Sequence, residues 1–137
     1  TTQTQKLTQG VHHVGLTVKD LGATKGFFIE TLGYEVLGEV PAYPAVFLSD
    51  GNIMMTLWQV QNDQEIIEFD RKHHIGLHHI SFKINDEVGL DGVYQKLEST
   101  EGVTIEFTPE DLGGGLTKHM MITEPGGIRI EFIAPAK

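Results

Sequence analysis

The chain contains no cysteine among its 137 residues, which excludes disulfides, thiolate metal ligands and a cysteine nucleophile. Any metal must therefore be bound through nitrogen and oxygen atoms. Basic residues are also few, since 10 Lys and Arg stand against 19 Asp and Glu, for a formal net charge of -9. Such a chain offers no diffuse basic surface to phosphates, so nucleic acid is not an expected partner.

Long apolar runs are missing as well. No segment approaches the ~20 apolar residues of a membrane span, and the polar start TTQTQKLTQG lacks the apolar stretch of a signal peptide. We therefore expect no membrane partner, a cytoplasmic location, and a flexible tail over residues 1–10. The length fits one compact domain.

Two similar segments, HHVGLTVKD at 12–20 and LHHISFKI at 77–84, indicate an internal repeat. Each is rich in β-branched residues, typical of a strand, and apolar residues at helical spacing follow each one. Three further strand patterns come next in both halves, with hairpin turns at Asp50-Gly51 and at Pro125-Gly126-Gly127 in matching places. The sequence predicts an α+β fold of two tandem βαβββ modules, residues 11–60 and 75–134, joined by a polar connector, residues 61–74.

Alternation along the strands separates polar from apolar side chains. The repeat aligns His13 with His79 and Thr56 with Glu131, which places both histidines and the glutamate opposite the apolar face. We call this polar side the inner face of each sheet. The residues predicted to face the helices and the core are Val14, Leu16, Val18, Ile80, Phe82, Ile84, Ile128, Ile130 and Phe132.

The inner-face residues His13, His79 and Glu131 are candidate metal ligands. A buried charge without a partner costs several kcal/mol, and two histidines with a carboxylate can satisfy one another around a divalent cation. Each histidine alone could equally be a core or edge residue, and the glutamate a solvated one, but their matching register favours the metal. Nitrogen and oxygen ligands suit Fe2+, Mn2+, Ni2+ or Zn2+.

Further side chains share the inner face and are candidate pocket residues: Met54, Thr56, Trp58, His119 and Met121. His119 could support Glu131 or shuttle a proton, or it could be a plain exposed histidine. The methionines could instead fill gaps in the core. His12 and His78 stand at the starts of their strands and alternate with the inner-face residues, so they point toward the apolar face. We expect both to be packed or half-exposed edge histidines.

The motifs HHVGLTVKDL, GLHHISFKI and EPGGIRIEFI resemble those of the vicinal oxygen chelate superfamily. This family includes glyoxalase I, extradiol dioxygenases, fosfomycin-resistance transferases, methylmalonyl-CoA epimerase and the bleomycin-resistance binding proteins. The resemblance covers about residues 11–133. It implies a U-shaped metal-containing cleft, a divalent metal bound by His13, His79 and Glu131, and a homodimer with two sites at its interface. The modules could pair within the chain or by exchange between the two chains of the dimer.

Two inner-face positions depart from the patterns of particular branches. Thr56 stands where glyoxalase I-like proteins have a glutamate, and Met121 stands where extradiol enzymes have a tyrosine. The resemblance implies a lyase or oxidoreductase of the glyoxalase/dioxygenase type, which chelates a small-molecule substrate through neighbouring oxygens to a Lewis-acidic metal, with Glu131 as the catalytic base. The alternative is a metal-free small-molecule-binding protein of the bleomycin-resistance type.

Overall fold

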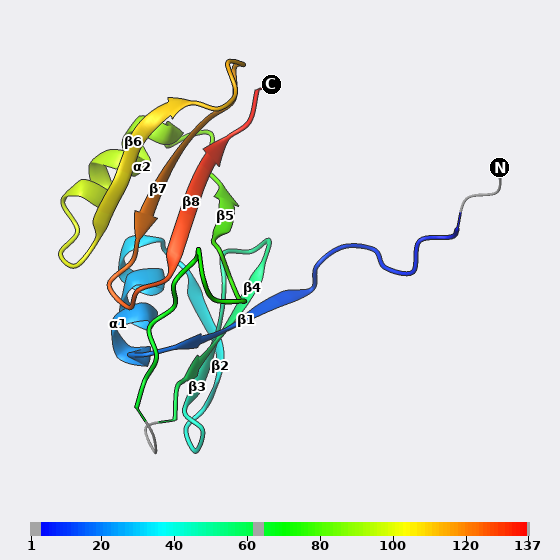
Figure 1. The fold of residues 1–137 in the computed structure, drawn as a ribbon, viewed down its shortest axis with the longest axis vertical. Coiled ribbons are helices and arrows are strands. Elements are labelled where there is room, and N and C mark those ends of the chain that lie inside the picture. The colour runs from blue at the N-terminus through cyan, green and yellow to red at the C-terminus, as the bar shows by residue number, and fades with distance from the viewer. Residues whose placement is uncertain (1–3, 62–64, 137) are drawn as a thin grey trace.

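The computed structural model describes residues 4–61 and 65–136, which form two four-stranded sheets of the same topology (Figure 1). The first sheet has the spatial order β1-β4-β3-β2, with β1 (His13–Val18), β2 (Glu35–Val40), β3 (Ala45–Ser49) and β4 (Met54–Gln59). The second has the order β5-β8-β7-β6, with β5 (Ile80–Lys83), β6 (Thr104–Asp111), β7 (Lys118–Thr123) and β8 (Arg129–Ala134). In each sheet the first strand runs parallel to the fourth, and the other pairs are antiparallel. The prediction of tandem βαβββ modules is confirmed.

A helix follows the first strand of each sheet. In the first module, α1 (Leu21–Gly26) begins after Asp20, whose carboxylate accepts a hydrogen bond of 3.0 Å from the Ala23 N–H. The helix continues as a π-helical turn, η1 (Phe27–Thr31). Gly33 then takes a φ of +80°, which glycine adopts without steric cost. In the second module, α2 (Gly89–Glu98) covers one face of the sheet (Figure 1). Its Leu90 and Leu97 belong to the same core as Ile130 and Phe132.

The apolar faces of both sheets meet in one shared core. Leu16 and Val18 are buried in the first module, and Ile130 and Phe132 in the second, as the strand alternation predicts. His12 and His78 are instead exposed, because the strands begin at residues 13 and 80 and both histidines lie in the extended segments before them. The expectation that these two are packed or half-exposed is therefore wrong.

A buried carboxylate joins the two modules. Glu124 is 1% exposed and accepts hydrogen bonds from the Thr24 hydroxyl (2.9 Å) and from the N–H groups of Gly126 (2.8 Å) and Ile128 (2.7 Å). Thr24 belongs to α1, whereas Glu124 begins the turn from β7 to β8. A Cβ atom at Gly126 would lie 2.0 Å from the Thr24 hydroxyl oxygen, so only glycine fits at this contact. The contact fixes how the first module packs on the second.

The connections differ in detail from the sequence prediction. The turn between β3 and β4 spans residues 50–53, longer than a two-residue Asp50-Gly51 hairpin, because the Asp50 carboxylate accepts bonds from the N–H groups of Asn52 and Ile53. Residues 65–79 of the connector region have no strand or helix, and residues 4–12 extend away from the body (Figure 1). The predicted tail and connector also include residues 1–3 and 62–64, which lie outside the described residues. Across the described ranges, no helix is long and apolar enough to cross a membrane.

Candidate metal centre

Two of the three candidate metal ligands meet on the second sheet. Glu131 pairs with Ser81 across β8 and β5, and His79 lies two residues before Ser81 on the same face. The Nε2 atom of His79 is 3.7 Å from Oε1 of Glu131, and these side chains are 33% and 12% exposed. Bonds of roughly 2.0–2.2 Å to one metal place two donor atoms about 3–3.6 Å apart. The separation therefore fits two ligands of a common ion after a small adjustment.

His119 holds the other oxygen of Glu131. Its Nδ1 atom is 2.6 Å from Oε2 of Glu131, and its Nε2 atom is 3.5 Å from Oε1 of Glu110. The imidazole is 8% exposed and packs on the ring of Phe107, with centroids 4.8 Å apart. This arrangement orients the carboxylate, as supporting residues do around metal ligands.

The Glu131 side chain is ionised at neutral pH. Burial opposes the charge, but the hydrogen bond from His119, the neighbouring Ser81 hydroxyl and the His79 ring outweigh it, so the pKa of Glu131 lies below its usual value. A carboxylate, and not a carboxylic acid, is the form that binds a metal.

The third candidate ligand, His13, lies exposed at the start of β1 on the first sheet, where its register partner is Met54. Its Nδ1 atom is 2.9 Å from Nδ1 of His12. In the part of the chain that the structure describes, no three His, Asp or Glu side chains are grouped closely enough to hold a metal. The structure thus brings together His79, Glu131 and His119, and it does not bring His13 to them within one chain.

The inner face of the first sheet is apolar and aromatic. The buried Thr56 hydroxyl accepts a hydrogen bond of 2.9 Å from the Trp58 indole and lies 3.5 Å from the Val14 carbonyl. The Trp58 ring contacts the rings of Tyr43 and Phe47, at centroid distances of 4.8 and 5.8 Å. We call these three residues the aromatic cluster.

The other predicted pocket residues lie on both sheets. Met54 is half-buried on the first sheet. Met121 is 4% exposed and is the register partner of Glu131 on the second sheet. Sequence reasoning named Trp58 but missed its two aromatic neighbours. Strand parity could have identified Phe47, whereas Tyr43 lies in a loop that gives no such signal.

A second polar network adjoins His79. Arg129 donates to both carboxylate oxygens of Glu106, at 2.9 and 2.5 Å, and its Nη1 atom is 3.2 Å from Nδ1 of His78. Nδ1 of His78 is in turn 2.7 Å from Nδ1 of His79. Desolvation and the Arg129, His79 and Arg71 side chains lower the pKa of His78, which favours its neutral form. Alternation along β8 puts Arg129 on the same face as Glu131, but nothing in the sequence indicates its contact with His78.

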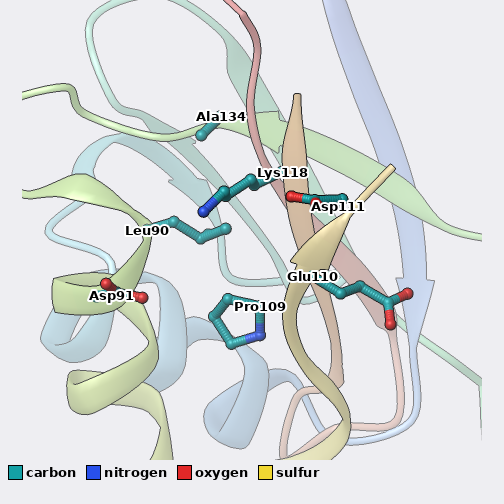
Figure 2. A pocket seen from close by; sticks show the side chains of 7 residues that line it. All are labelled: Leu90, Asp91, Pro109, Glu110, Asp111, Lys118 and Ala134. Atoms are coloured by element: carbon teal, nitrogen blue, oxygen red, sulfur yellow. The ribbon is translucent and has the colours of Figure 1, made fainter. Parts of the chain in front are cut away.

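Two cavities lie beside the second sheet. One of about 810 Å³ lies between β1, the turn before β8 and the connector, and its lining includes Thr17, Arg71, His78 and Arg129. The other, of about 480 Å³, lies between α2 and one edge of the second sheet, where β6 and β8 end and β7 begins (Figure 2). Lys118 points into this smaller cavity, while the Glu110 carboxylate points away from it (Figure 2). The larger cavity is lined by His78, the residue next to the candidate metal ligand His79.

Two mixed sheets of duplicated βαβββ topology, with a histidine at the matching place before or at the start of the first strand of each, have the architecture of a glyoxalase-like protein. The sequence matches the model of the Glyoxalase/Bleomycin resistance protein/Dioxygenase superfamily over residues 10–132, and the chain belongs to this family. The resemblance inferred from the motifs is therefore confirmed. No match was found among curated protein sequences.

Solved structures of several family members share the fold. A glyoxylase/bleomycin resistance protein/dioxygenase domain from Frankia sp. EAN1pec has a TM-score of 0.79 at 21% identity, covering 95% of this chain and 94% of that one. The fosfomycin resistance protein FosX from Listeria monocytogenes has a TM-score of 0.70 at 18% identity, with 95% and 96% covered. Lactoylglutathione lyase from Agrobacterium tumefaciens has a TM-score of 0.70 at 21% identity, with 94% and 96% covered. These likenesses establish the fold.

Proposed function

We propose that the protein is a metal-dependent enzyme of the glyoxalase/dioxygenase type, a lyase or an oxidoreductase, that acts on a small oxygenated substrate. The observation that carries this proposal is the pair of donor atoms on the second sheet, His79 Nε2 and Glu131 Oε1, 3.7 Å apart. A variant of FosX has been solved with Mn(II) and a dihydroxypropylphosphonic acid, so a related fold does hold a divalent metal together with a vicinal diol. The cytoplasmic location stays a prediction.

The donor set suits Fe2+, Mn2+, Ni2+ or Zn2+. His79 and Glu131 would bind the ion from the second sheet and His13 from the first. When bound, such a metal supplies Lewis-acid stabilisation of negative charge on a chelated substrate oxygen. The cavity of about 810 Å³ beside His78 falls in the range of roughly 300–1,000 Å³ that is typical of small-molecule sites.

Glu131 is the candidate catalytic base. Its depressed pKa keeps it ionised, and Oε1 is the oxygen that His119 leaves free. To act as the base, Oε1 would have to detach from a bound metal and take the proton from a substrate carbon, while the His119 bond to Oε2 keeps the carboxyl group oriented. Met121, the register partner of Glu131, has no group that transfers a proton.

We further propose a homodimer in which His13 of one chain completes the site of the other. Support comes from the placement of His13 on the first sheet, apart from the His79 and Glu131 pair. The edge strand β2 also exposes apolar side chains, with Leu37 59% and Val36 44% exposed, as expected of an edge that a partner covers.

The test is the metal content of tag-free protein, measured by mass spectrometry beside the His79→Ala variant. We expect near one equivalent of a transition metal per chain, lost in His79→Ala and retained in the control His73→Ala, whose imidazole is exposed in the connector. Absence of bound metal, together with no affinity for added Fe2+, Mn2+, Ni2+ or Zn2+, would reject the enzyme proposal.

The second candidate function is metal-free binding of a flat molecule, as in the bleomycin-resistance type. The aromatic cluster of Tyr43, Phe47 and Trp58 favours it, because edge-on aromatic surfaces bind planar ligands. Trp58 is the single tryptophan, so its fluorescence reports on this surface directly. Binding of anilinonaphthalene sulfonate that persists in EDTA and in Glu131→Gln, but not in Phe47→Ala, would favour this function.

A further inference from the structure

Both modules present a pair of adjacent histidines joined through the same ring atoms. Nδ1 of His12 is 2.9 Å from Nδ1 of His13, and Nδ1 of His78 is 2.7 Å from Nδ1 of His79. The rings are steeply inclined, at 84° and 69°. In each pair the second histidine uses Nδ1 for its neighbour, which leaves Nε2 available for another partner. For His79 that atom faces Glu131.

Such a contact needs one donor and one acceptor, because a neutral imidazole carries a proton on one nitrogen and a lone pair on the other. The distance alone does not determine which histidine donates. If His79 donates from Nδ1, its lone pair is on Nε2, the atom beside Glu131. If His78 donates, the Nδ1 atom of His79 holds the lone pair and Nε2 carries a proton, which blocks metal binding there.

Arg129 decides between these two arrangements. Its guanidinium can only donate hydrogen bonds, and its Nη1 atom lies 3.2 Å from Nδ1 of His78. A proton on that nitrogen would face the N–H of a cation, so His78 must present its lone pair. Glu106 holds the guanidinium in this position through two hydrogen bonds, which are charge-assisted and bidentate.

We infer that Arg129 is a positioning residue that sets the tautomer of His79 through His78. The single lone pair of His78 Nδ1 is shared between Arg129 and His79 in a three-centre hydrogen bond, so the His79 proton is on Nδ1. The Nε2 atom of His79 then carries the lone pair, because at 3.7 Å it lies beyond hydrogen-bond distance from Glu131 Oε1. This inference builds on the proposed function, since it makes Nε2 of His79 ready to bind a metal before the metal arrives. A fixed tautomer is the usual role of a second partner on a ligating histidine.

In the first module, no arginine occupies the position that matches Arg129. Ile80 pairs with Ile130, so the residues just before them, His79 and Arg129, lie opposite each other. The equivalent residues of the first sheet are His13 and Met54. The thioether of Met54 cannot donate a hydrogen bond. The His12 and His13 contact is therefore free to exist in either direction, and His13 serves as an internal reference for His79.

The tautomers can be measured in metal-free protein by two-bond proton–nitrogen correlation NMR, at a pH about two units above the usual histidine pKa of ~6.5. We expect His79 to carry its proton on Nδ1 in the parent protein. In Arg129→Met, which copies the first module, a substantial Nε2–H population should appear at His79, and Arg129→Lys should restore part of the bias because an ammonium also only donates. The control Lys25→Met removes a cation of the first module, one paired with Glu39, and should leave the His79 signal unchanged.

A proton on Nε2 of His79 in the parent protein would overturn the inference, and that spectrum decides even if Arg129→Met fails to fold. An unchanged His79 tautomer in folded Arg129→Met would overturn it as well. Titration with Zn2+ then separates the two proposals: Arg129→Met should bind about 10–100-fold more weakly than the parent, and Lys25→Met equally well. Parent protein with the expected tautomer but no Zn2+ binding would refute the metal enzyme and leave the role of Arg129 intact.

Discussion

The two modules have the same strand order and the same parallel pairing of first and fourth strands, yet their inner faces are chemically opposite. On β4 of the first module the inner side chains are Met54, Thr56 and Trp58, and the aromatic cluster extends this surface. On β8 of the second module the matching positions hold Arg129 and Glu131. The same backbone fold thus carries largely apolar side chains on the inner face of the first module and charged, hydrogen-bonded candidate metal ligands on that of the second. The two halves of the proposed site are therefore unequal.

The largest difference should be in metal affinity at the matched positions Glu131 and Thr56. Glu131→Ala removes a predicted ligand and should weaken Zn2+ binding by more than about 100-fold, beyond the loss typical of a supporting residue. Thr56→Ala should change it by less than about threefold, since the Thr56 hydroxyl is engaged by Trp58. Isothermal titration of both variants checks this, and equal losses would show that the modules contribute alike.

The next contrast concerns stability at the two β-turns. Glu124→Ala leaves the N–H groups of Gly126 and Ile128 and the Thr24 hydroxyl without their acceptor, so we expect about 3 kcal/mol or more of lost unfolding free energy. The residue at the matching turn is Ser49, whose hydroxyl accepts a single bond from the Gly51 N–H. Ser49→Ala should cost about 0.5–1 kcal/mol in urea unfolding. Similar costs would mean that Glu124 does not join the modules.

A smaller difference in unfolding free energy is expected between the alanine variants of Gly126 and Gly51. Gly126→Ala places a methyl group against the Thr24 hydroxyl and should cost about 1–3 kcal/mol, a cost that falls in the Thr24→Ala background. Gly51 has a φ of +94° and open space around it, so Gly51→Ala costs backbone strain that Thr24→Ala cannot relieve. Unfolding of the single and double variants measures the coupling. Additive costs at Gly126 would exclude the predicted contact.

The smallest effect is the loss of stability in acid that comes from one ion pair of the second module. The hydrogen bonds from Arg129 hold the pKa of Glu106 below its ordinary value of 4.5. A carboxyl group with a depressed pKa stabilises the fold above 4.5, and this contribution is lost as the pH falls through the folded pKa. Glu106→Gln should therefore be less stable than the parent at neutral pH by no more than about 1 kcal/mol, because the pair is partly exposed. The gap should close on acidification, and a gap that widens would contradict the sign.

Sequence patterns predicted the duplicated modules, the buried strand faces and the inner-face positions of His79 and Glu131, because these follow from alternation along each strand. The contact between Thr24 and Glu124 joins residues far apart in the chain and depends on how the modules pack, which no local pattern contains. The same holds for the Arg129 contact with His78. The exposure of His12 and His78 was mispredicted because parity was extended beyond the strand ends.

The most direct test of an unequal, shared metal site is to mix two variants that should each fail to bind metal, His13→Ala and His79→Ala. If His13 of one chain completes the site of the other, a mixed dimer contains one intact site and one doubly altered site. After unfolding and refolding the variants together, we predict that the mixed dimers recover about half of the parental metal content. A mixture that binds no more metal than the separate variants would contradict a site shared between the two unlike modules of different chains.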